Sequence, residues 1–330
     1  MTSYCIPDAA ADLAAVAALL EIGERLGVSD LLDCQEPATV AEFAARAGTA
    51  EQPMASYLAA LTAAGLAEQL APDGSGAKFR GAPDIGEFRY AAGYLSWAID
   101  ANRPLLAHAR EFFRDPATAT VRHSRDGVRV AVSAAWIGSL GFYPGITAAV
   151  LARPPAKLVD LGAGAGGLLI RLLRELPESK GVALDINVAA CEEARRAAAA
   201  AGMAGRLSVV ACAIESLVAD PSPIEGADLI HAGFVMHDLV ASGAAPEVLA
   251  TCRTILAPGG RVIVTDAVPN VPDERERRFS ALFSYLHASF MNVQLPTEQE
   301  WIDLFAKAGF SDISAQPQRL PGGRLFIAVK

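Results

Sequence analysis

The chain has 330 residues, of which 52% are hydrophobic and 20% are charged, a balance typical of a folded globular protein. This length allows two domains, or one large domain with an appendage. The formal net charge of −9 argues against a nucleic-acid-binding face, because such faces use Lys and Arg to displace counterions from phosphates. We therefore expect a small-molecule partner and no nucleic acid.

The start of the sequence and its cysteines predict the compartment. Residues 1–30 lack the basic start and apolar run of a secretory signal. No stretch stays apolar for the roughly 18 residues that a membrane span requires. The 5 cysteines are scattered without a CxxC pair, which is typical of buried, reduced thiols. These features predict a cytoplasmic protein without a membrane partner.

The N-terminal part of the sequence has the pattern of a winged helix. Apolar residues at helical spacing predict an amphipathic helix over residues 9–26. Thr39 can cap a second helix that ends at Gly48, and a third helix is expected to end at Gly65. Two strand-like runs then flank the turn at residues 72–76. Together these elements predict a winged helix-turn-helix.

A winged helix often binds DNA, but this sequence argues against it. Residues 52–64, where a recognition helix would lie, contain no Arg or Lys to contact base edges. We therefore predict a mainly helical winged-helix dimerisation domain over residues 1–100, and a homodimer. Residues 101–148 follow as an aromatic, helical linker, which either packs as core or forms a pocket wall.

The remaining residues, 149–330, alternate between strands and helices. Strands are expected at residues 157–162, 181–186, 207–212, 227–234 and 261–268. Residues 310–330 form two more strand-like runs around a Pro-Gly-Gly turn. The sequence therefore predicts an α/β fold, a Rossmann-like doubly wound sheet that ends in a β-hairpin.

A glycine-rich loop follows the first of these strands. Gly162, Gly164 and Gly167 form GxGxxG between a strand and a helix, where missing side chains let the backbone approach a ligand. The pattern alone fits a nicotinamide cofactor or S-adenosylmethionine. S-adenosylmethionine is a cation without a pyrophosphate, so it tolerates the nearby carboxylate of Asp160. Asp185, at the end of the next strand, is expected to accept hydrogen bonds from the ribose hydroxyls.

The run Asp-Leu-Gly-Ala-Gly-Ala-Gly resembles the first motif of class I methyltransferases, over roughly residues 157–330. With the winged helix, the whole chain resembles the O-methyltransferase superfamily of plant phenolic and bacterial antibiotic pathways. The resemblance implies an enzyme that uses S-adenosylmethionine. It departs at residues 212–214, where Cys-Ala-Ile replaces the Asp that usually holds the adenine, so adenine contacts must come from backbone or other neighbours.

His237 and Asp238 fall where that superfamily places its His-Asp pair, just beyond the carboxyl edge of the sheet. In the O-methyl branch the histidine resembles a general base that takes a hydroxyl proton. O-methyl relatives usually add a glutamate that orients this histidine, and here Gln294 stands in its place. The alternative for His237 is a histidine that only packs at a strand end.

His287 changes the predicted chemistry. Together with the His-Asp pair and the Leu-Pro-Thr before Glu300-Trp301, it resembles the α-keto acid β-C-methyltransferases of nonribosomal-peptide antibiotic pathways. That resemblance implies that His237 and His287 bind one metal ion, and imidazole suits Fe or Zn. The alternative is a histidine in the pocket wall of an O-methyltransferase.

The resemblance thus implies methyl transfer to the β-carbon of a hydrophobic α-keto acid in secondary metabolism, with the metal stabilising an enolate. Arg125 resembles the arginine that neutralises the keto acid carboxylate, and its alternative is a solvated surface charge. Asp238 either orients a ligand or assists deprotonation.

The alternative functions are a metal-free small-molecule O-methyltransferase with His237 as base, and a catalytically silent binding protein. The sequence offers no motif for His231.

Overall fold

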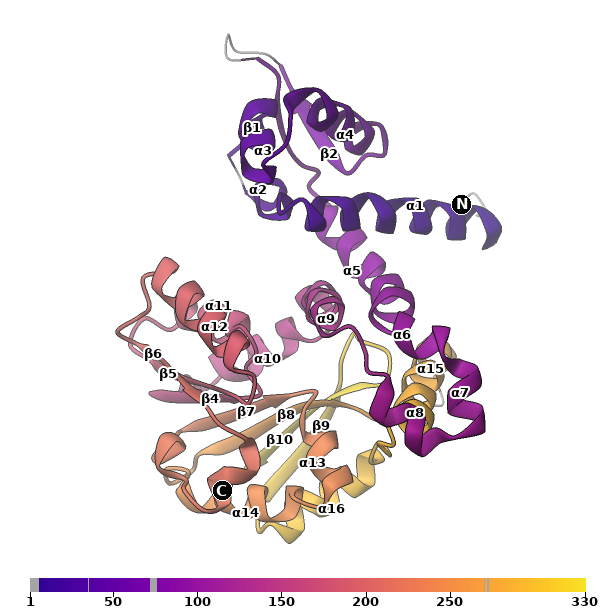
Figure 1. Cartoon of the computed structure of the whole chain (residues 1–330). Coiled ribbons are helices and arrows are strands. Elements are labelled where there is room, and N and C mark those ends of the chain that lie inside the picture. The colour runs from indigo at the N-terminus through magenta and orange to yellow at the C-terminus, as the bar shows by residue number, and fades with distance from the viewer. Residues whose placement is uncertain (1–5, 35, 72–75, 270, 272) are drawn as a thin grey trace. The chain divides into compact units, whose positions relative to one another are not determined.

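The computed structural model describes residues 6–34, 36–71, 76–269, 271 and 273–330 (Figure 1). The chain divides into two compact units. The first comprises residues 1–109 and 123–140, and the second comprises residues 110–122 and 141–330. The segment 101–148 thus contributes to both units. The three predicted domains, the winged-helix assignment and the dimer stay predictions.

The first unit is mainly helical and carries a small antiparallel sheet of strand order β1-β3-β2. Its strands are β1 Ala38–Thr39, β2 Ala67–Leu70 and β3 Lys78–Gly81. Its helices are α1 Ile6–Arg25, α2 Ser29–Asp33, α3 Val40–Ala47, α4 Glu51–Ala63, α5 Ile85–Leu95, the π-helix Ser96–Ala101, α6 Arg103–Ala107 and α9 Gly127–Gly141. They pack around a core that includes Phe43, Leu58 and Leu61.

The predicted helix boundaries in this unit rest on caps that the structure contains. Thr39 and Glu42 form a capping box at the start of α3, and Gly48 ends the helix at φ 63°. The predicted strands pair as the hairpin β2–β3. Of the turn predicted at residues 72–76, residues 72–75 lie outside the described part of the chain. Cys34 is exposed, which corrects the expectation that all the cysteines are buried.

The second unit is built on a seven-stranded sheet of order β6-β5-β4-β7-β8-β10-β9. Strands β4 to β8 are parallel, whereas β10 runs antiparallel to both β8 and β9. This arrangement confirms the predicted doubly wound α/β sheet with a C-terminal hairpin. The strands are β4 Lys157–Leu161, β5 Lys180–Asp185, β6 Leu207–Ala211, β7 Leu229–Gly233, β8 Arg261–Ala267, β9 Ser311–Pro317 and β10 Gly323–Val329.

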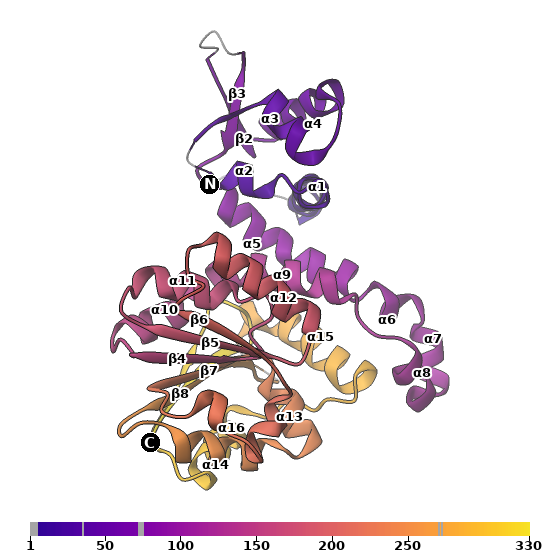
Figure 2. The ribbon, with the colours of Figure 1, turned by 60° about the vertical axis from the view of Figure 1, so that its left-hand side comes forward.

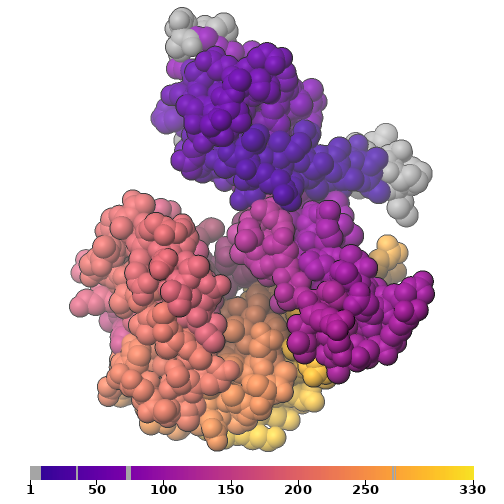
Figure 3. Space-filling view, in the orientation of Figure 1, coloured from indigo at the N-terminus to yellow at the C-terminus, as the bar shows by residue number. Residues whose placement is uncertain are grey.

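Helices cover both faces of this sheet, as Figures 1 and 2 show. α10, α11 and α12 lie on one face, and α13, α14 and α16 lie on the other. Figure 3 shows the same view in space-filling form. The helices are α7 Ala109–Arg114, α8 Pro116–Arg122, α10 Tyr143–Leu151, α11 Gly167–Glu175, α12 Val188–Ala200, α13 Met236–Ser242, α14 Ala245–Ile255, α15 Glu274–Phe290, α16 Glu298–Lys307 and the short 3₁₀ turns Ile214–Val218 and Ser222–Ile224.

Burial on both faces explains why the inner parallel strands β4, β5, β7 and β8 are mostly apolar. All seven residues of β8 are buried, Asp266 among them. Residues of alternate positions on the central strands, such as Val159, Ile230 and Val264, join α13, α14 and α16 in one core cluster. Asp160 and His231 occupy the intervening positions, so their side chains project from the opposite face.

α9 and α10 are joined at a bend in an apolar part of the sequence. Across the described residues, no single helix has both the length and the apolar character of a membrane span. Helices α9 and α10 reach the length and apolar composition of a span only when they are taken together, and the pair is bent by 57°.

Candidate active site

A cavity of about 340 Å³ lies at the carboxyl ends of the parallel strands in the second unit. Its volume falls within the range of small-molecule sites. Three residues that the sequence singled out, Gly162, Asp185 and Asp238, line it. Its other lining residues are Ile186, Ala213, Ile214, Glu215, Gly233, Phe234, Val235 and Leu239. The cavity therefore opens where α/β sheets bind ligands.

The glycine loop reaches this cavity at Gly162. Gly162 and Gly164 have φ angles of 72° and 54°, a region that side chains rarely adopt. The third left-handed glycine is Gly166, which caps the start of α11 at φ 75°. The predicted motif counted Gly167 instead, because GxGxxG spacing does not say which of two adjacent glycines makes the turn.

Asp185 is fixed at the end of β5 by the loop itself. Its Oδ2 accepts a hydrogen bond from the Gly164 N–H at 2.8 Å, and its Oδ1 accepts one from the Asn187 N–H at 2.8 Å. The carboxylate is therefore held at the cavity wall between the loop and the start of α12. That Asp185 binds ribose hydroxyls stays a prediction. Its position at the cavity wall favours this role.

Asp160 is buried below the loop and is absent from the residues that line the cavity among those described. Its Oδ1 lies 2.6 Å from Nδ1 of His231, which stands on the neighbouring strand β7. Burial and the negative charge of Asp160 together raise the pKa of Tyr143 to about 12. The sequence therefore placed Asp160 near the right loop and missed its histidine partner.

Replacing Gly162 with Ala tests how tightly the loop is built. A Cβ there would lie 3.1 Å from a methyl group of Val235, which lines the cavity, and would add strain at positive φ of roughly 1–2 kcal/mol. Gly164→Ala is the matched control, because its Cβ would meet no described atom within 4 Å. We expect Gly162→Ala to lower the free energy of unfolding more than Gly164→Ala in urea titrations. An equal decrease in the free energy of unfolding for both variants would contradict the close packing of Gly162 against Val235.

His237 lies in the first turn of α13 and is oriented by a carboxylate that the sequence reasoning missed. Its ring Nδ1 lies 2.7 Å from Oδ1 of Asp266, and its backbone N–H donates to Oδ2 of the same residue at 3.1 Å. A carboxylate only accepts, so Nδ1 carries a proton and the neutral ring keeps its lone pair on Nε2. The sequence feature that could have identified Asp266 is the presence of an aspartate within the otherwise apolar run of β8.

His287 lies on α15 and faces His237. Its Nδ1 lies 2.8 Å from the carbonyl oxygen of Phe283, which can only accept, so its Nε2 also carries the lone pair of the neutral ring. The ring stacks on Phe283 with centroids 4.1 Å apart. The His237 and His287 rings lie 5.2 Å apart and perpendicular. The structure thus brings together two histidines that the sequence separates.

Asp238 completes this end of the site. Its Oδ1 lies 3.6 Å from Nε2 of His237, and its side chain is 58% exposed at the cavity. Gln294, where a glutamate was expected, is exposed. Thr297 and Glu300 form the capping box of α16, and Trp301 is fully buried in the core. The Leu-Pro-Thr and Glu-Trp motif therefore builds a helix start.

Arg125, the predicted contact of the substrate carboxylate, lies between α8 and α9. It belongs to the first unit, whereas His237 and His287 belong to the second. Its role therefore stays a prediction.

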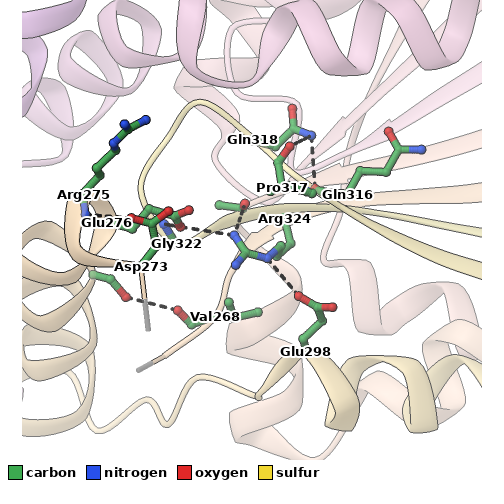
Figure 4. A network of polar contacts seen from close by, with 12 residues as sticks. Val268, Asp273, Arg275, Glu276, Glu298, Gln316, Pro317, Gln318, Gly322 and Arg324 are labelled. Atoms are coloured by element: carbon green, nitrogen blue, oxygen red, sulfur yellow. Dashed lines mark hydrogen bonds and ion pairs between the residues drawn. The ribbon is translucent and has the colours of Figure 1, made fainter. Parts of the chain in front are cut away.

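A polar network anchors the beginning of α15, the helix that carries His287 (Figure 4). Arg324 on β10 donates from Nε to Glu298 on α16 at 2.9 Å and from Nη1 to Glu276 on α15 at 3.3 Å. Glu276 also accepts from the Gly322 N–H at 2.8 Å. Arg324 stands opposite Asp266 in the β8–β10 register. One side chain thus links α15 and α16 to β10, the neighbour of the strand that orients His237.

Replacing Arg324 with Gln is expected to loosen α15. Its side chain is only 12% exposed, so loss of its charged hydrogen bonds should lower the free energy of unfolding by roughly 1–3 kcal/mol. Arg196→Gln is the matched control, because its pair with Glu193 is exposed and worth roughly 0–1 kcal/mol. Urea unfolding of both variants measures the difference. An Arg324→Gln variant as stable as Arg196→Gln would contradict the anchoring role.

Comparison with known proteins identifies the family of this site. Residues 146–311 match the family model of the O-methyltransferase domain. The chain belongs to the O-methyltransferase domain family. The matched residues include the glycine loop, Asp185, His237, Asp266 and His287.

Relatives within this family differ in activity. The chain is 32% identical over 154 residues to aclacinomycin 10-hydroxylase RdmB of Streptomyces purpurascens, a match that covers 47% of this chain and 39% of that protein. It is 29% identical to 3-hydroxy-5-methyl-1-naphthoate 3-O-methyltransferase of Streptomyces sahachiroi, over 87% of this chain and 84% of the relative. It is 25% identical to indolepyruvate C-methyltransferase of Streptomyces griseus, over 48% and 47%.

The fold is also that of a solved methyltransferase. Human N-acetylserotonin methyltransferase in complex with SAM superposes with a TM-score of 0.61 at 18% identity. The alignment covers 100% of this chain and 99% of the human chain. At this identity the likeness is one of fold.

Proposed function

We propose that this protein transfers a methyl group from S-adenosylmethionine to the β-carbon of a hydrophobic α-keto acid. The observation that carries the proposal is the pair of buried histidines, His237 and His287, whose rings lie 5.2 Å apart near the cavity wall at Asp238. Membership of the O-methyltransferase domain family and the C-methyltransferase relative support the reaction class.

The cavity at the glycine loop fits the methyl donor. Asp185, held by the loop, offers carboxylate oxygens to ribose hydroxyls. The apolar side chains of Ile186 and Ile214 line the cavity and suit the faces of an adenine ring. Glu215, which also lines it, is the acidic residue nearest in sequence to the Asp that the motif lacks. These residues support binding of an adenosine ligand.

The two histidines fit a shared metal ion. Imidazoles bound through Nε2 at about 2.1 Å and a tetrahedral angle have ring centres about 5 Å apart, close to the separation of His237 and His287. Asp266 and the Phe283 carbonyl hold the two Nδ1 protons, as the outer partners of ligating histidines do. When bound, such an ion would polarise the keto oxygen and make the β-proton more acidic.

The residues of the chain then divide the remaining tasks. His237 and His287 would hold the ion, and Asp238, beside His237 at the cavity, would accept the β-proton on a carboxylate oxygen. The electron pair of the broken C–H bond forms the new bond from the β-carbon to the methyl carbon. The methyl–sulfur bond breaks as this bond forms, and S-adenosylhomocysteine leaves.

A second candidate is O-methylation of a phenolic acid without a metal. The His237–Asp266 hydrogen bond favours it, because an oriented imidazole with its lone pair on Nε2 is a general base for a hydroxyl proton. The naphthoate O-methyltransferase relative, which spans 87% of this chain, supports it as well. In that reaction His287 would only line the pocket.

A substrate panel separates the two functions. The purified protein is incubated with S-adenosylmethionine and with phenylpyruvate, 4-methyl-2-oxovalerate, a guanidino keto acid or a hydroxynaphthoate, and product masses are recorded. We expect methylated keto acid and no methylated naphthoate. Methylation of the hydroxynaphthoate alone would favour the second candidate. Cofactor binding without any methylated product would overturn both.

A further inference from the structure

Two histidines and a glutamate gather at the ends of the segment that contains α7 and α8, residues 109–122. His108 ends α6, Glu111 lies in the first turn of α7, and His123 directly follows α8. One continuous stretch, residues 108–123, therefore supplies all three side chains. Their spacing matches none of the short metal-ligand motifs, because α7 and α8 separate the two histidines.

The three side chains lie within reach of one bound ion. The rings of His108 and His123 stack with centroids 3.8 Å apart and planes 10° from parallel. The ligand atoms, one from each of the two histidines and one from Glu111, all lie within 4.8 Å of one another. Two nitrogens on a tetrahedral zinc ion lie about 3.4 Å apart. The ligand atoms therefore need to approach by no more than a rotation of their side chains.

Partial exposure allows this rotation. Parallel rings do not point at a common ion, so one imidazole has to turn about its side-chain torsions when the ion binds. His108 and His123 are partly exposed, and Glu111 is exposed. A close-packed interior would oppose such a turn, whereas a side chain at the surface changes rotamer readily. The same exposure gives the ion a path from solvent.

The residue types favour zinc among the common metal ions. Two histidines and a glutamate form one of the three-ligand sets that bind Zn²⁺, with water in the fourth position. Each neutral imidazole offers one lone pair to the ion, and the glutamate adds a negative charge. Mg²⁺ and Ca²⁺ prefer sites made of oxygen ligands, so the two imidazoles argue against these ions.

We propose that His108, Glu111 and His123 bind a zinc ion that holds together the two ends of the segment 109–122. The ion is structural, because it ties the end of α6 to the residue after α8 and contacts no substrate. Phe112 holds α7 by a separate contact, since it is buried and its ring centroid lies 4.6 Å from that of Phe290 on α15. The ion thus reinforces a segment that is also packed without it.

Calorimetric titration of the full chain with zinc tests the site. A His287→Phe background removes the histidine pair proposed at the active site, and dialysis against a chelator first removes bound metal. We expect this background to bind one zinc ion per chain. Adding His123→Ala should weaken zinc binding roughly 100-fold or more, because losing a ligand costs more than the 10- to 100-fold loss that follows removal of a ligand's outer partner. Adding Glu111→Gln should weaken it by roughly tenfold or more.

Asp115→Asn is the matched control for Glu111→Gln. Both changes remove one negative charge from the same segment, but Asp115 accepts from the Thr118 N–H at the start of α8, a task that Asn performs equally well. In the same background we expect Asp115→Asn to keep its zinc affinity within about twofold. An Asp115→Asn loss as large as that of Glu111→Gln would show that only the charge of the segment matters, and would overturn the site.

Thermal unfolding with and without zinc is the second readout. Zinc should raise the unfolding midpoint of the background and of the Asp115→Asn control, because a ligand that binds only the folded state stabilises it. The midpoint of the His123→Ala variant should not change. Circular dichroism without zinc checks folding, and the exposed position of Glu111 keeps the test valid if His123→Ala does not fold. No zinc binding by the background, or undiminished binding after both ligand substitutions, would overturn the proposal.

Discussion

Asp266→Asn is expected to lower kcat roughly 10- to 100-fold, because it disturbs the orientation of His237. Both carboxylate oxygens of Asp266 accept from donors: Oδ1 from the His237 ring and the Ala267 N–H, and Oδ2 from the His237 backbone N–H. An Asn side chain must turn its NH₂ toward one of these donors. One arrangement moves the ring proton to Nε2 and removes the lone pair that both proposed reactions need.

The control for this variant is Asp273→Asn. Asp273 caps α15 and accepts from the Arg275 N–H, a task that Asn performs equally well. Steady-state assays of both variants, with circular dichroism to confirm folding, measure the effect. We expect Asp273→Asn to stay within about twofold of the wild type. A folded Asp266→Asn protein with wild-type kcat would show that the orientation of His237 is unimportant.

His287→Phe separates the two proposed reactions. Phe fills the space of the imidazole and keeps the stacking on Phe283, at 4.1 Å between centroids, while it removes both ring nitrogens. If His287 holds a metal ion, the rate of keto acid methylation should fall by roughly 100-fold or more. A bound metal ion lowers the activation free energy by several kcal/mol, and this contribution is lost with the ion. Affinity for S-adenosylhomocysteine should not change, because His287 does not line the cofactor cavity among the described residues.

Metal content of the purified proteins is the second readout. The first unit holds another pair of imidazoles, His108 and His123, whose rings stack 3.8 Å apart. The double variant His108→Ala/His123→Ala therefore controls for metal bound there. We expect His287→Phe to lose bound metal and the control to keep its keto acid activity. Full activity of His287→Phe, together with indifference to chelators, would favour the metal-free alternative.

The inner part of the sheet was predictable from the sequence because strands β4, β5, β7 and β8 are buried on both faces. Such strands are continuous apolar runs bounded by Gly and Pro, and each strand of the second unit lies within its predicted range or within a residue or two of it. Gly48 and Thr39 gave the boundaries of α3 because caps are local. The left-handed turn at Gly166 was not predicted, because only the backbone angle distinguishes this glycine from Gly167.

The polar pairs of the site were not predictable in the same way. Asp266 is 29 residues from His237, and Asp160 is 71 residues from His231, so only strand order brings either pair together. The sequence did give the positions of His237 and His287, through their resemblance to a known pattern. It could not show that a carboxylate from β8, and not one near Gln294, orients the first of them.

The most direct test of the proposed function is where the methyl group becomes attached. The protein is supplied with S-adenosylmethionine labelled with a magnetic carbon isotope in its methyl group, and with phenylpyruvate labelled likewise at the β-carbon. Nuclear magnetic resonance of the product should show one-bond coupling between the two labelled carbons. A labelled methyl carbon bonded to oxygen, without carbon–carbon coupling, would contradict the proposal.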